Sequence, residues 1–336
     1  MLPLNNDFKN LHSTADLLSF IFAKREFFSS ENSTQTIEYI DDGIFITSPK
    51  TVKDSQHTLI FSCGIHGNET APIEILSDLL IAVLHNQIQP KNPCLWIFGN
   101  LDAIKVGKRF IDLNLNRLFT SKDLVEQDNE TCRAKAIKTH VNRFCKSYPN
   151  FRKLHCDLHT AIRDSHYGKF AIIPFSQTGS RLDNVRKQQL QAMGIEAVVY
   201  SHKQSSTFSS YTALTWEAES YTLELGKVRP FGENPKSVTE APQNTLRSLL
   251  CSETLPAAQT SLKEFVVIHE VIKSTETFKL FVEDDFANFT PFAAHTLIAQ
   301  DKNYEYRAER DNVRLIFPNS QVQLGHRAGL IIEMIK

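Results

Sequence analysis

The sequence has little of several features that mark large classes of proteins. Its 37 lysine and arginine residues nearly balance its 38 aspartate and glutamate residues, which leaves a net charge of −1. A chain without excess positive charge lacks the electrostatic signature of a nucleic-acid binder or of a protein on an anionic membrane. The longest purely apolar run, residues 79–84, is far too short to span a bilayer. We therefore expect a small molecule as the partner, with no nucleic acid and no membrane.

Cysteine patterns and common catalytic motifs are also missing. Six cysteines are scattered over 336 residues without close pairs, which argues against a disulfide framework and against a Cys-rich zinc module. The first residues have no basic stretch followed by an apolar run, so no export is predicted and we expect a cytoplasmic protein with reduced thiols. The absence of G-x-G-x-x-G after a strand, of a P-loop and of G-x-S-x-G disfavours dinucleotide enzymes, nucleotide-phosphate enzymes and serine hydrolases.

The chain does contain a regular alternation of short apolar runs and amphipathic stretches. Runs rich in branched or aromatic residues predict buried strands at 57–63, 94–100, 152–158, 170–174, 196–200 and 220–225. Helical spacing predicts helices at 14–28, 71–86, 131–145, 181–194 and 238–250. Two strands are expected around the turn at 41–43. The alternation indicates an α/β fold with a mixed, mostly parallel sheet covered by helices.

A change in composition at residues 251–261, which are rich in Ser, Thr and Pro, is interpreted as a connector. Residues 1–252 would then form the catalytic α/β domain, with its N-terminal helix and hairpin. Residues 253–336 contain several short strand patterns and no convincing helix, which predicts a small C-terminal β domain.

Polar residues follow three of the expected strands, where α/β sheets usually bind ligands. His66 and Glu69 lie in a glycine-flanked loop after the first strand, and His159 follows the strand 152–158. Two histidines and one glutamate are the ligand set of many catalytic zinc sites, with a fourth position left for water. Asp157 would project on the same side of its strand as His159 and could fix which imidazole nitrogen carries the proton.

Glu224 follows a third strand and has apolar neighbours, so it is a candidate general base. Arg109, the pair Asn116–Arg117 and Arg163 lie in irregular polar segments or after strands, and together they would suit a substrate with several carboxylates. A histidine, glutamate or arginine in such a position is, taken alone, more often an ordinary surface or core residue than a site residue. The convergence of complementary ligand types at three strand ends favours the metal site.

The segments 64–72 (GIHGNETAP), 157–163 (DLHTAIR), 222–234 (TLELGKVRPFGEN) and 325–330 (GHRAGL) carry a resemblance that extends over nearly the whole chain. The sequence resembles the zinc carboxypeptidase-like amidohydrolases, the family of the aspartoacylases and desuccinylases. Two positions depart from the usual pattern of that family. Asn114 stands where an aspartate is usual, and Leu101 stands where a proline is usual.

The resemblance implies a zinc-carboxypeptidase-like fold, one Zn²⁺ per subunit, and a role for each candidate residue. His66, Glu69 and His159 would be the zinc ligands, and Glu224 the general base. Arg109 would polarise the scissile carbonyl.

The implied reaction is hydrolysis of the amide bond of N2-succinylglutamate to succinate and glutamate, the last step of the succinyltransferase route of arginine catabolism. Asn116 and Arg117 would hold a carboxylate of this substrate, and Arg163 is our candidate for binding its succinyl end. Three alternatives remain open at this point: a deacylase for another N-acyl amino acid such as N-acetylaspartate, a true carboxypeptidase, and a noncatalytic zinc-dependent carboxylate-binding protein.

Overall fold

The computed structural model describes residues 6–23, 26–31, 34–51, 57–120, 128–176, 181–302 and 304–335. At the N-terminus it has a short 3-10 helix, η1 (Asn6–Asn10), then α1 (Thr14–Phe22), β1 (Phe28–Glu31), β2 (Gln35–Asp41) and β3 (Ile44–Pro49). The predicted helix over 14–28 is therefore too long, because Phe28 begins a strand that pairs with β2. The ring of Phe28 packs against Phe8, Phe20 and Tyr39, so tertiary contacts outweigh the local helical pattern there.

The centre of the molecule consists of the six predicted strands. They are β4 (His57–Cys63), β5 (Cys94–Phe98), β6 (Arg152–Ala161), β7 (Lys169–Ile173), β8 (Ala197–Tyr200) and β9 (Glu219–Lys227). β5, β4, β6 and β9 are neighbours and run parallel, whereas β7 is antiparallel to β9 and β8 follows the direction of β7. The carboxyl ends of β4, β6 and β9, where the candidate residues lie, therefore share one edge of the sheet.

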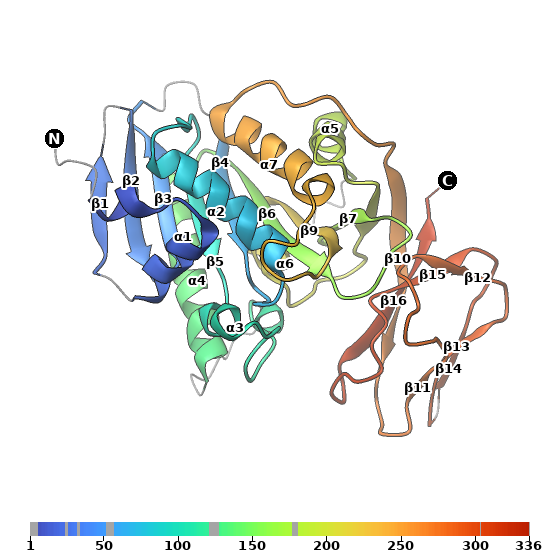
Figure 1. Cartoon of the computed structure of the whole chain (residues 1–336). Coiled ribbons are helices and arrows are strands. Elements are labelled where there is room, and N and C mark those ends of the chain that lie inside the picture. The colour runs from blue at the N-terminus through green and yellow to red at the C-terminus, as the bar shows by residue number, and fades with distance from the viewer. Residues whose placement is uncertain are drawn as a thin grey trace.

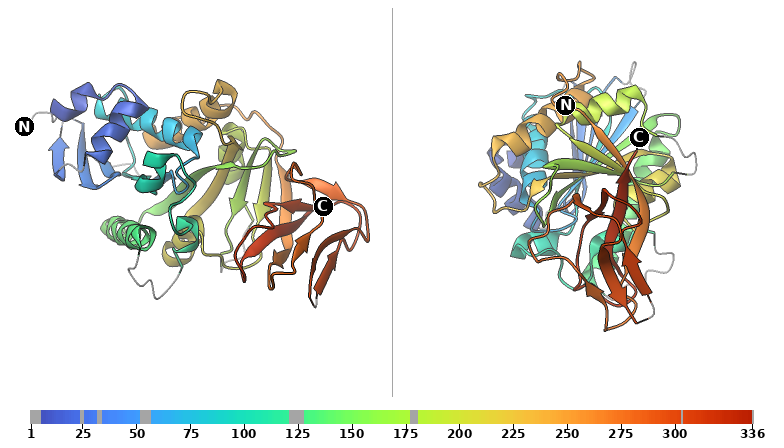
Figure 2. Two further views of the ribbon diagram at one scale, coloured as in Figure 1. Left: turned by 60° about the horizontal axis from the view of Figure 1, so that its bottom comes forward. Right: turned by 90° about the vertical axis from the view of Figure 1, so that its right-hand side faces the viewer.

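Helices cover both faces of the sheet, as the edge-on view in Figure 2 shows. α2 (Thr70–Leu84), α5 (Asn184–Ala192) and α7 (Lys236–Cys251) share one core with α1, and α4 (Asn129–Ser147) and α6 (Phe208–Trp216) bury a second core on the opposite face. α3 (Leu101–Val106) and the short η2 (Leu115–Arg117) follow β5. α3 and α6 were not predicted. Within the described segments, no helix combines the length and the apolar composition that crossing a membrane requires.

The C-terminal part adds β10 (Lys263–Ile272), β11 (Lys279–Leu280), β12 (Thr290–Phe292), β13 (Leu297–Asp301), β14 (Tyr304–Arg307), β15 (Val313–Ile316) and β16 (Arg327–Met334). β10 pairs in parallel with β8, so one 13-stranded sheet runs in the order β1-β2-β3-β5-β4-β6-β9-β7-β8-β10-β16-β15-β12. A separate sheet of order β11-β13-β14 completes this unit, which lies at the lower right of Figure 1. Its pairings, apart from that of β10 with β8, are antiparallel.

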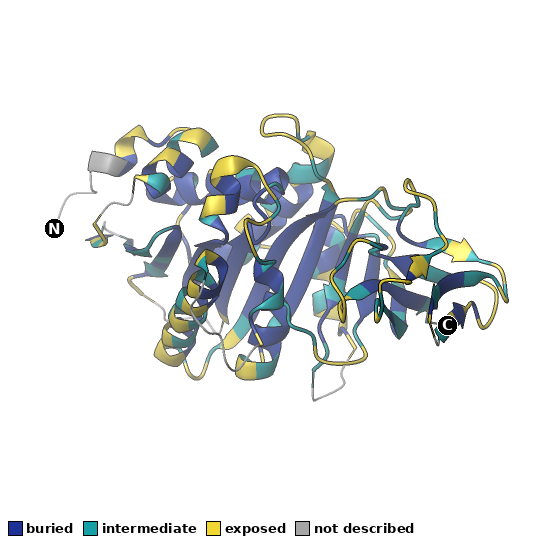
Figure 3. Cartoon of the chain, turned by 90° about the horizontal axis from the view of Figure 1, so that it is seen from below, coloured by how far each residue is buried: buried dark blue, intermediate teal, exposed yellow. Residues whose placement is uncertain are grey.

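The burial pattern follows from these layers. The central strands are buried along most of their length, and the exposed residues gather on the outer sides of the helices and in loops (Figure 3). Polar residues within this buried region therefore need hydrogen-bond partners from the protein itself or from a ligand. Several of those buried polar residues lie at the shared carboxyl edge of β4, β6 and β9.

Candidate metal centre and active site

The structure brings His66, Glu69 and His159 together at this edge. One ligand atom from each residue lies within 4.8 Å of the other two, and all three side chains are buried. Glu69 is at the centre of the group, with Oε1 2.8 Å from His66 Nδ1 and Oε2 2.9 Å from His159 Nδ1. Two imidazoles and one carboxylate therefore converge from the loop after β4 and from β6.

The loop after β4 depends on a glycine that packs against α3. A Cβ atom at Gly67 would lie 2.2 Å from the carbonyl carbon of Ala103, so only glycine fits without movement of the backbone. The Gly67 N–H also donates to the carbonyl of Arg109 at 3.1 Å. Glu69 is the N-cap residue of α2, yet its side chain makes no capping bond because the carboxylate faces the histidines.

The outer nitrogen of each histidine faces an oxygen. His159 Nε2 lies 3.0 Å from Asp157 Oδ2, and His66 Nε2 lies 3.0 Å from Asn114 Oδ1. An acceptor at Nε2 holds the proton there and leaves Nδ1 of the neutral imidazole with a lone pair for a cation. Asn114 therefore keeps the oxygen that the more usual aspartate would offer to His66.

The carboxylates of this group favour a positive charge, which a proton on His159 supplies without a metal and a bound cation would supply in its place. Burial acts to lower the pKa of His159, but the charges of Asp157 and Glu69 outweigh it and hold that pKa well above its usual value. The pKa of Glu69 is held well below its usual value by both histidines, against the effect of burial. A buried set of two nitrogen ligands and one carboxylate, with their outer atoms oriented, fits the preferences of Zn²⁺.

Glu224 lies beside the group on β9, where its Cα is the ladder partner of that of His159. The side chain is buried, and its Oε2 atom has no hydrogen-bond partner among the described residues. Burial raises the pKa of Glu224 to about 7, although the charge of His159 opposes this rise. A carboxylate with a free oxygen and such a pKa is suited to exchange protons at neutral pH.

Arg109 also belongs to the site, because its Nη1 atom donates to Glu69 Oε1 at 2.7 Å. The segment that carries it is held by Glu130 on α4, whose Oε1 accepts from the Ile111 N–H at 2.7 Å and from Asn100 Nδ2 at 3.0 Å. No pattern in the sequence pointed to Glu130 as part of the site. A buried glutamate at a helix start has no distinct local signal, since acidic residues are common there for electrostatic reasons.

Asn116 and Arg117 lie next to Asn114 in η2, as their spacing implies. Asn116 Oδ1 accepts from the Phe208 N–H at 2.9 Å and so ties η2 to the start of α6. Burial and the nearby charges of Arg327 and Arg109 lower the pKa of Arg117 to about 9. Arg327, the first residue of β16, thus lies near the same region, although its position in the sequence did not indicate a site residue.

Arg163 has a different place. Its Nη1 atom donates to the backbone carbonyls of Asp284 and Glu283, at 2.5 and 3.2 Å, in the C-terminal unit. The neighbouring Asp164 forms an ion pair with Lys227 at 2.9 Å. Arg163 therefore bridges to the C-terminal unit and makes no hydrogen bond or ion pair with the metal-ligand group.

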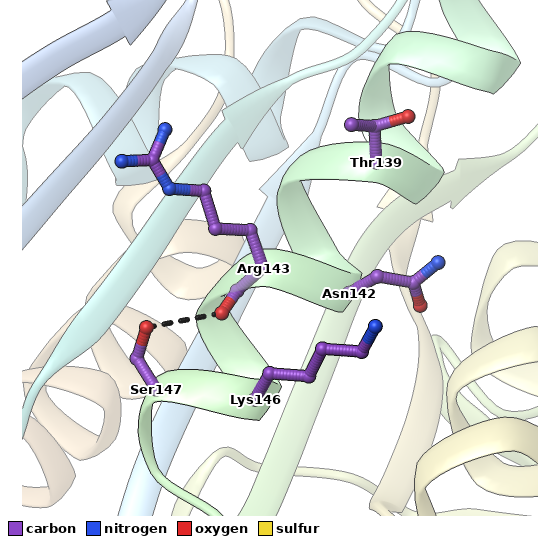
Figure 4. Close-up of a pocket in the computed structure, with 5 residues that line it drawn as sticks. All are labelled: Thr139, Asn142, Arg143, Lys146 and Ser147. Carbon is purple, nitrogen blue, oxygen red and sulfur yellow. Dashed lines mark hydrogen bonds between the residues drawn. The ribbon is translucent and has the colours of Figure 1, made fainter.

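A hollow on α4 is chemically distinct from this site. It is lined by Thr139, Asn142, Arg143, Lys146 and Ser147, and Figure 4 shows the hydrogen bond of Ser147 to the Arg143 carbonyl. Because α4 ends just before β6 begins, this hollow lies near the amino ends of the parallel strands. It contains no pair of metal-ligating side chains, so we do not assign the chemistry to it.

The sequence matches two family models that together cover most of the chain. Residues 55–250 match the succinylglutamate desuccinylase/aspartoacylase catalytic domain, and residues 260–335 match the AstE/AspA barrel-sandwich hybrid domain. A relative from Pseudomonas fluorescens, named succinylglutamate desuccinylase, is 36% identical over 325 residues, which cover 94% of this chain and 96% of the relative.

Solved structures agree with these matches. The structure of succinylglutamate desuccinylase from Vibrio parahaemolyticus has a TM-score of 0.86 at 29% identity and covers 97% of this chain and 96% of its own. That from Chromobacterium violaceum has a TM-score of 0.81 at 32% identity and covers 96% and 98%. The predicted fold class, a mixed, mostly parallel sheet with helices and a small C-terminal β unit, is confirmed.

Proposed function

Since the chain belongs to the succinylglutamate desuccinylase/aspartoacylase family, we propose that it hydrolyses the amide bond of N2-succinylglutamate to succinate and glutamate with a bound zinc ion. One observation carries the proposal. The buried His66–Glu69–His159 group lies beside Glu224, a carboxylate that has an oxygen without a partner. The six cysteines are free thiols, which supports the cytoplasm as the place of reaction.

His66, Glu69 and His159 would hold the zinc ion through Nδ1, a carboxylate oxygen and Nδ1. A bound zinc ion acts as a Lewis acid on a carbonyl and makes water more acidic. The protein orients these ligands beforehand, because Asp157 and Asn114 fix the outer nitrogens of both histidines.

Glu224 is the proposed proton carrier. Its Oε2 atom would take the proton of the attacking water and deliver it to the leaving amine of glutamate. A carboxylate whose pKa is raised to about 7 can do both, since neither protonation state is strongly disfavoured at neutral pH. Arg109 is proposed to stabilise the negative charge that develops on the carbonyl oxygen, as a fixed cation already present at the site.

The cationic side chains support a substrate with several carboxylates. Among the described residues, Arg117 and Arg327 have no carboxylate within ion-pair distance, although both are partly buried and near each other, and only the more distant charge of Glu270 acts on both. Buried charges without partners are costly, so a pair of such guanidinium groups favours an anionic ligand. Asn116 would add its Nδ2 group, since only its Oδ1 is engaged. Arg163 would have to leave the carbonyls of Glu283 and Asp284 to bind the succinyl carboxylate, the role proposed for it.

The test is release of succinate from N2-succinylglutamate by protein of known zinc content, beside N-acetylaspartate and a peptide substrate. Turnover should depend on zinc and should be lost in Glu224→Gln, whereas Glu233→Gln, a change of an exposed glutamate, should keep the wild-type rate. Faster release of acetate from N-acetylaspartate than of succinate from N2-succinylglutamate would identify an acetylated amino acid as the substrate instead. Tight binding of the succinyl compound without turnover would support a noncatalytic carboxylate-binding protein and refute the proposal.

A further inference from the structure

A chain of buried side chains continues from the proposed zinc site into the core. Asp157, which contacts His159, also lies 2.6 Å from Ser62 Oγ through its Oδ1 atom. Ser62 Oγ lies 2.9 Å from His155 Nε2, and His155 Nδ1 lies 2.8 Å from Thr212 Oγ1. Ser62, His155, Asp157 and Thr212 are completely buried, with no exposed surface. The hydrogen-bonded series Thr212–His155–Ser62–Asp157 has no part in the reaction steps above.

The strands and one helix account for the arrangement. Residues 155, 157 and 159 alternate along β6 and so point to the same face of the sheet. Ser62 on β4 is the ladder partner of Asp157, which places its hydroxyl beside the carboxylate. α6 covers this face and supplies Thr212, and the ring of Phe208 on the same helix packs 4.5 Å from that of His155.

The direction of the two bonds between His155, Ser62 and Asp157 follows from the donor capacity of their atoms. A carboxylate only accepts, so the Ser62 hydroxyl donates to Asp157. Because that hydroxyl has a single proton, Ser62 can only accept from His155 Nε2. His155 therefore carries its proton on Nε2. Its Nδ1 is left as an acceptor beside the Thr212 hydroxyl, which also lies 2.8 Å from Ser220 Oγ and 3.1 Å from the Ser209 carbonyl. Burial lowers the pKa of His155 to about 4, which agrees with a neutral ring.

This direction rules out a nucleophilic role for Ser62. In a Ser-His-Asp triad the serine donates to the histidine, and the histidine donates to the carboxylate. Here the serine donates to the carboxylate and accepts from the histidine, and its side chain has no exposed surface. The chain therefore can only orient other groups.

We propose that Ser62 and His155 are positioning residues that fix Asp157 as an acceptor of two protons, one of them from His159 Nε2–H, so that His159 Nδ1 is directed to the cation. The protons of His155 Nε2 and of the Ser62 hydroxyl both point toward the carboxylate, and neither occupies the oxygen that faces His159. The inference rests on the proposed zinc site, but the two tests below distinguish failure of the inference from failure of the proposed function.

The first test is zinc affinity, measured by competition with a chromophoric chelator. Ser62→Ala removes the donor to Asp157 Oδ1, and loss of such outer contacts typically weakens metal binding by about 10-fold to 100-fold. Ser77→Ala is the matched control, because Ser77 is equally buried on α2 and its hydroxyl has no hydrogen-bond partner. Equal zinc affinity of the Ser62 variant, the Ser77 variant and the wild type would overturn the inference.

The second test reads the tautomers directly, by nitrogen NMR of histidine-labelled protein with and without zinc. His155 should be the Nε2–H tautomer in both forms, and His159 should be that tautomer when zinc is bound. His155→Gln keeps a donor near Nε2 and should retain most of the zinc affinity that His155→Leu loses. A His155 protonated on Nδ1 would refute the inference even if zinc binds. If wild-type protein binds no zinc, the proposed function fails, while the tautomer of His155 still decides whether the chain has the stated direction.

Discussion

Replacement of Glu224 by glutamine should lower turnover by orders of magnitude and, at the same time, stabilise the metal-free protein at alkaline pH. The carboxylate is 7% exposed and its Oε2 atom has no partner, so its ionised form is poorly compensated in the fold. Glutamine has nearly the same shape and carries no charge. A residue that costs stability and is needed for the reaction is typical of an active site.

The size of the effect follows from the pKa. The pKa of Glu224 rises from 4.5 in the unfolded chain to about 7 in the fold, mainly through burial. Between these values the folded state binds more protons than the unfolded state, so this group lowers stability as the pH rises. The full cost, reached above pH 7, is about 3 kcal/mol. Below pH 4.5 both states are protonated and the cost disappears.

The assay is urea unfolding of metal-free wild type and Glu224→Gln at pH 8 and at pH 4.5. We expect the variant to be more stable by up to about 3 kcal/mol at pH 8 and nearly equal to the wild type at pH 4.5. Succinate release should fall by about 10²-fold to 10⁴-fold, the usual contribution of a general acid–base group. A variant that is less stable than the wild type at pH 8, or that differs equally at both pH values, would refute the account of a desolvated carboxylate.

Three further predictions concern substrate binding, the ligand loop and the metal. Arg327→Met should raise the KM for N2-succinylglutamate by at least about 10-fold with a smaller change in kcat, as expected for a lost charge-assisted contact. The control Arg310→Met, on the exposed surface, should leave both constants unchanged, and an unaltered KM in Arg327→Met would exclude Arg327 from the substrate site. Gly67→Ala should destabilise the fold and lower activity because the new Cβ would lie 2.2 Å from the Ala103 carbonyl carbon. In the control Gly168→Ala the new Cβ meets only the side-chain oxygen of Glu196 at 3.3 Å, so the free energy of unfolding should change by less than about 1 kcal/mol. Equal unfolding curves for these two variants would contradict the packing argument. Zinc at 100 times its dissociation constant should stabilise the folded chain by about 2.7 kcal/mol, measured as a shift of the urea midpoint that EDTA reverses; no shift in a protein that still hydrolyses the substrate would argue against zinc.

The sequence determined the elements whose signals are local. Apolar runs predicted β4 to β9, and helical spacing predicted α2, α4, α5 and α7 within a few residues of their ends. α6 escaped prediction for a physical reason. Its Ser209, Ser210 and Thr212 are buried, and Ser209 and Thr212 contact polar side chains of β9 and β6, so it lacks the alternation of polar and apolar positions that marks a surface helix.

The metal-ligand group was also accessible from the sequence, because His66, Glu69 and His159 follow strands whose ends can be located by composition. Glu224 and Arg109 were named in the same way, and the structure places both beside Glu69 or His159. Their assigned roles remain proposals. Spacing along the chain sufficed here, since parallel neighbouring strands end at a common edge.

Only the tertiary structure decided which partners those residues have. Ser62 and Asp157 are 95 positions apart, and Asn114 is 48 positions from His66, so no local pattern connects them. The same holds for the approach of Arg327 to Arg117, and for Arg163, whose guanidinium is directed to the C-terminal unit. Hydrogen-bond direction and desolvation depend on what lies within a few ångströms in space. The sequence alone therefore located the residues proposed to carry the chemistry, and the packing of the strands decided how each is protonated, oriented and paired.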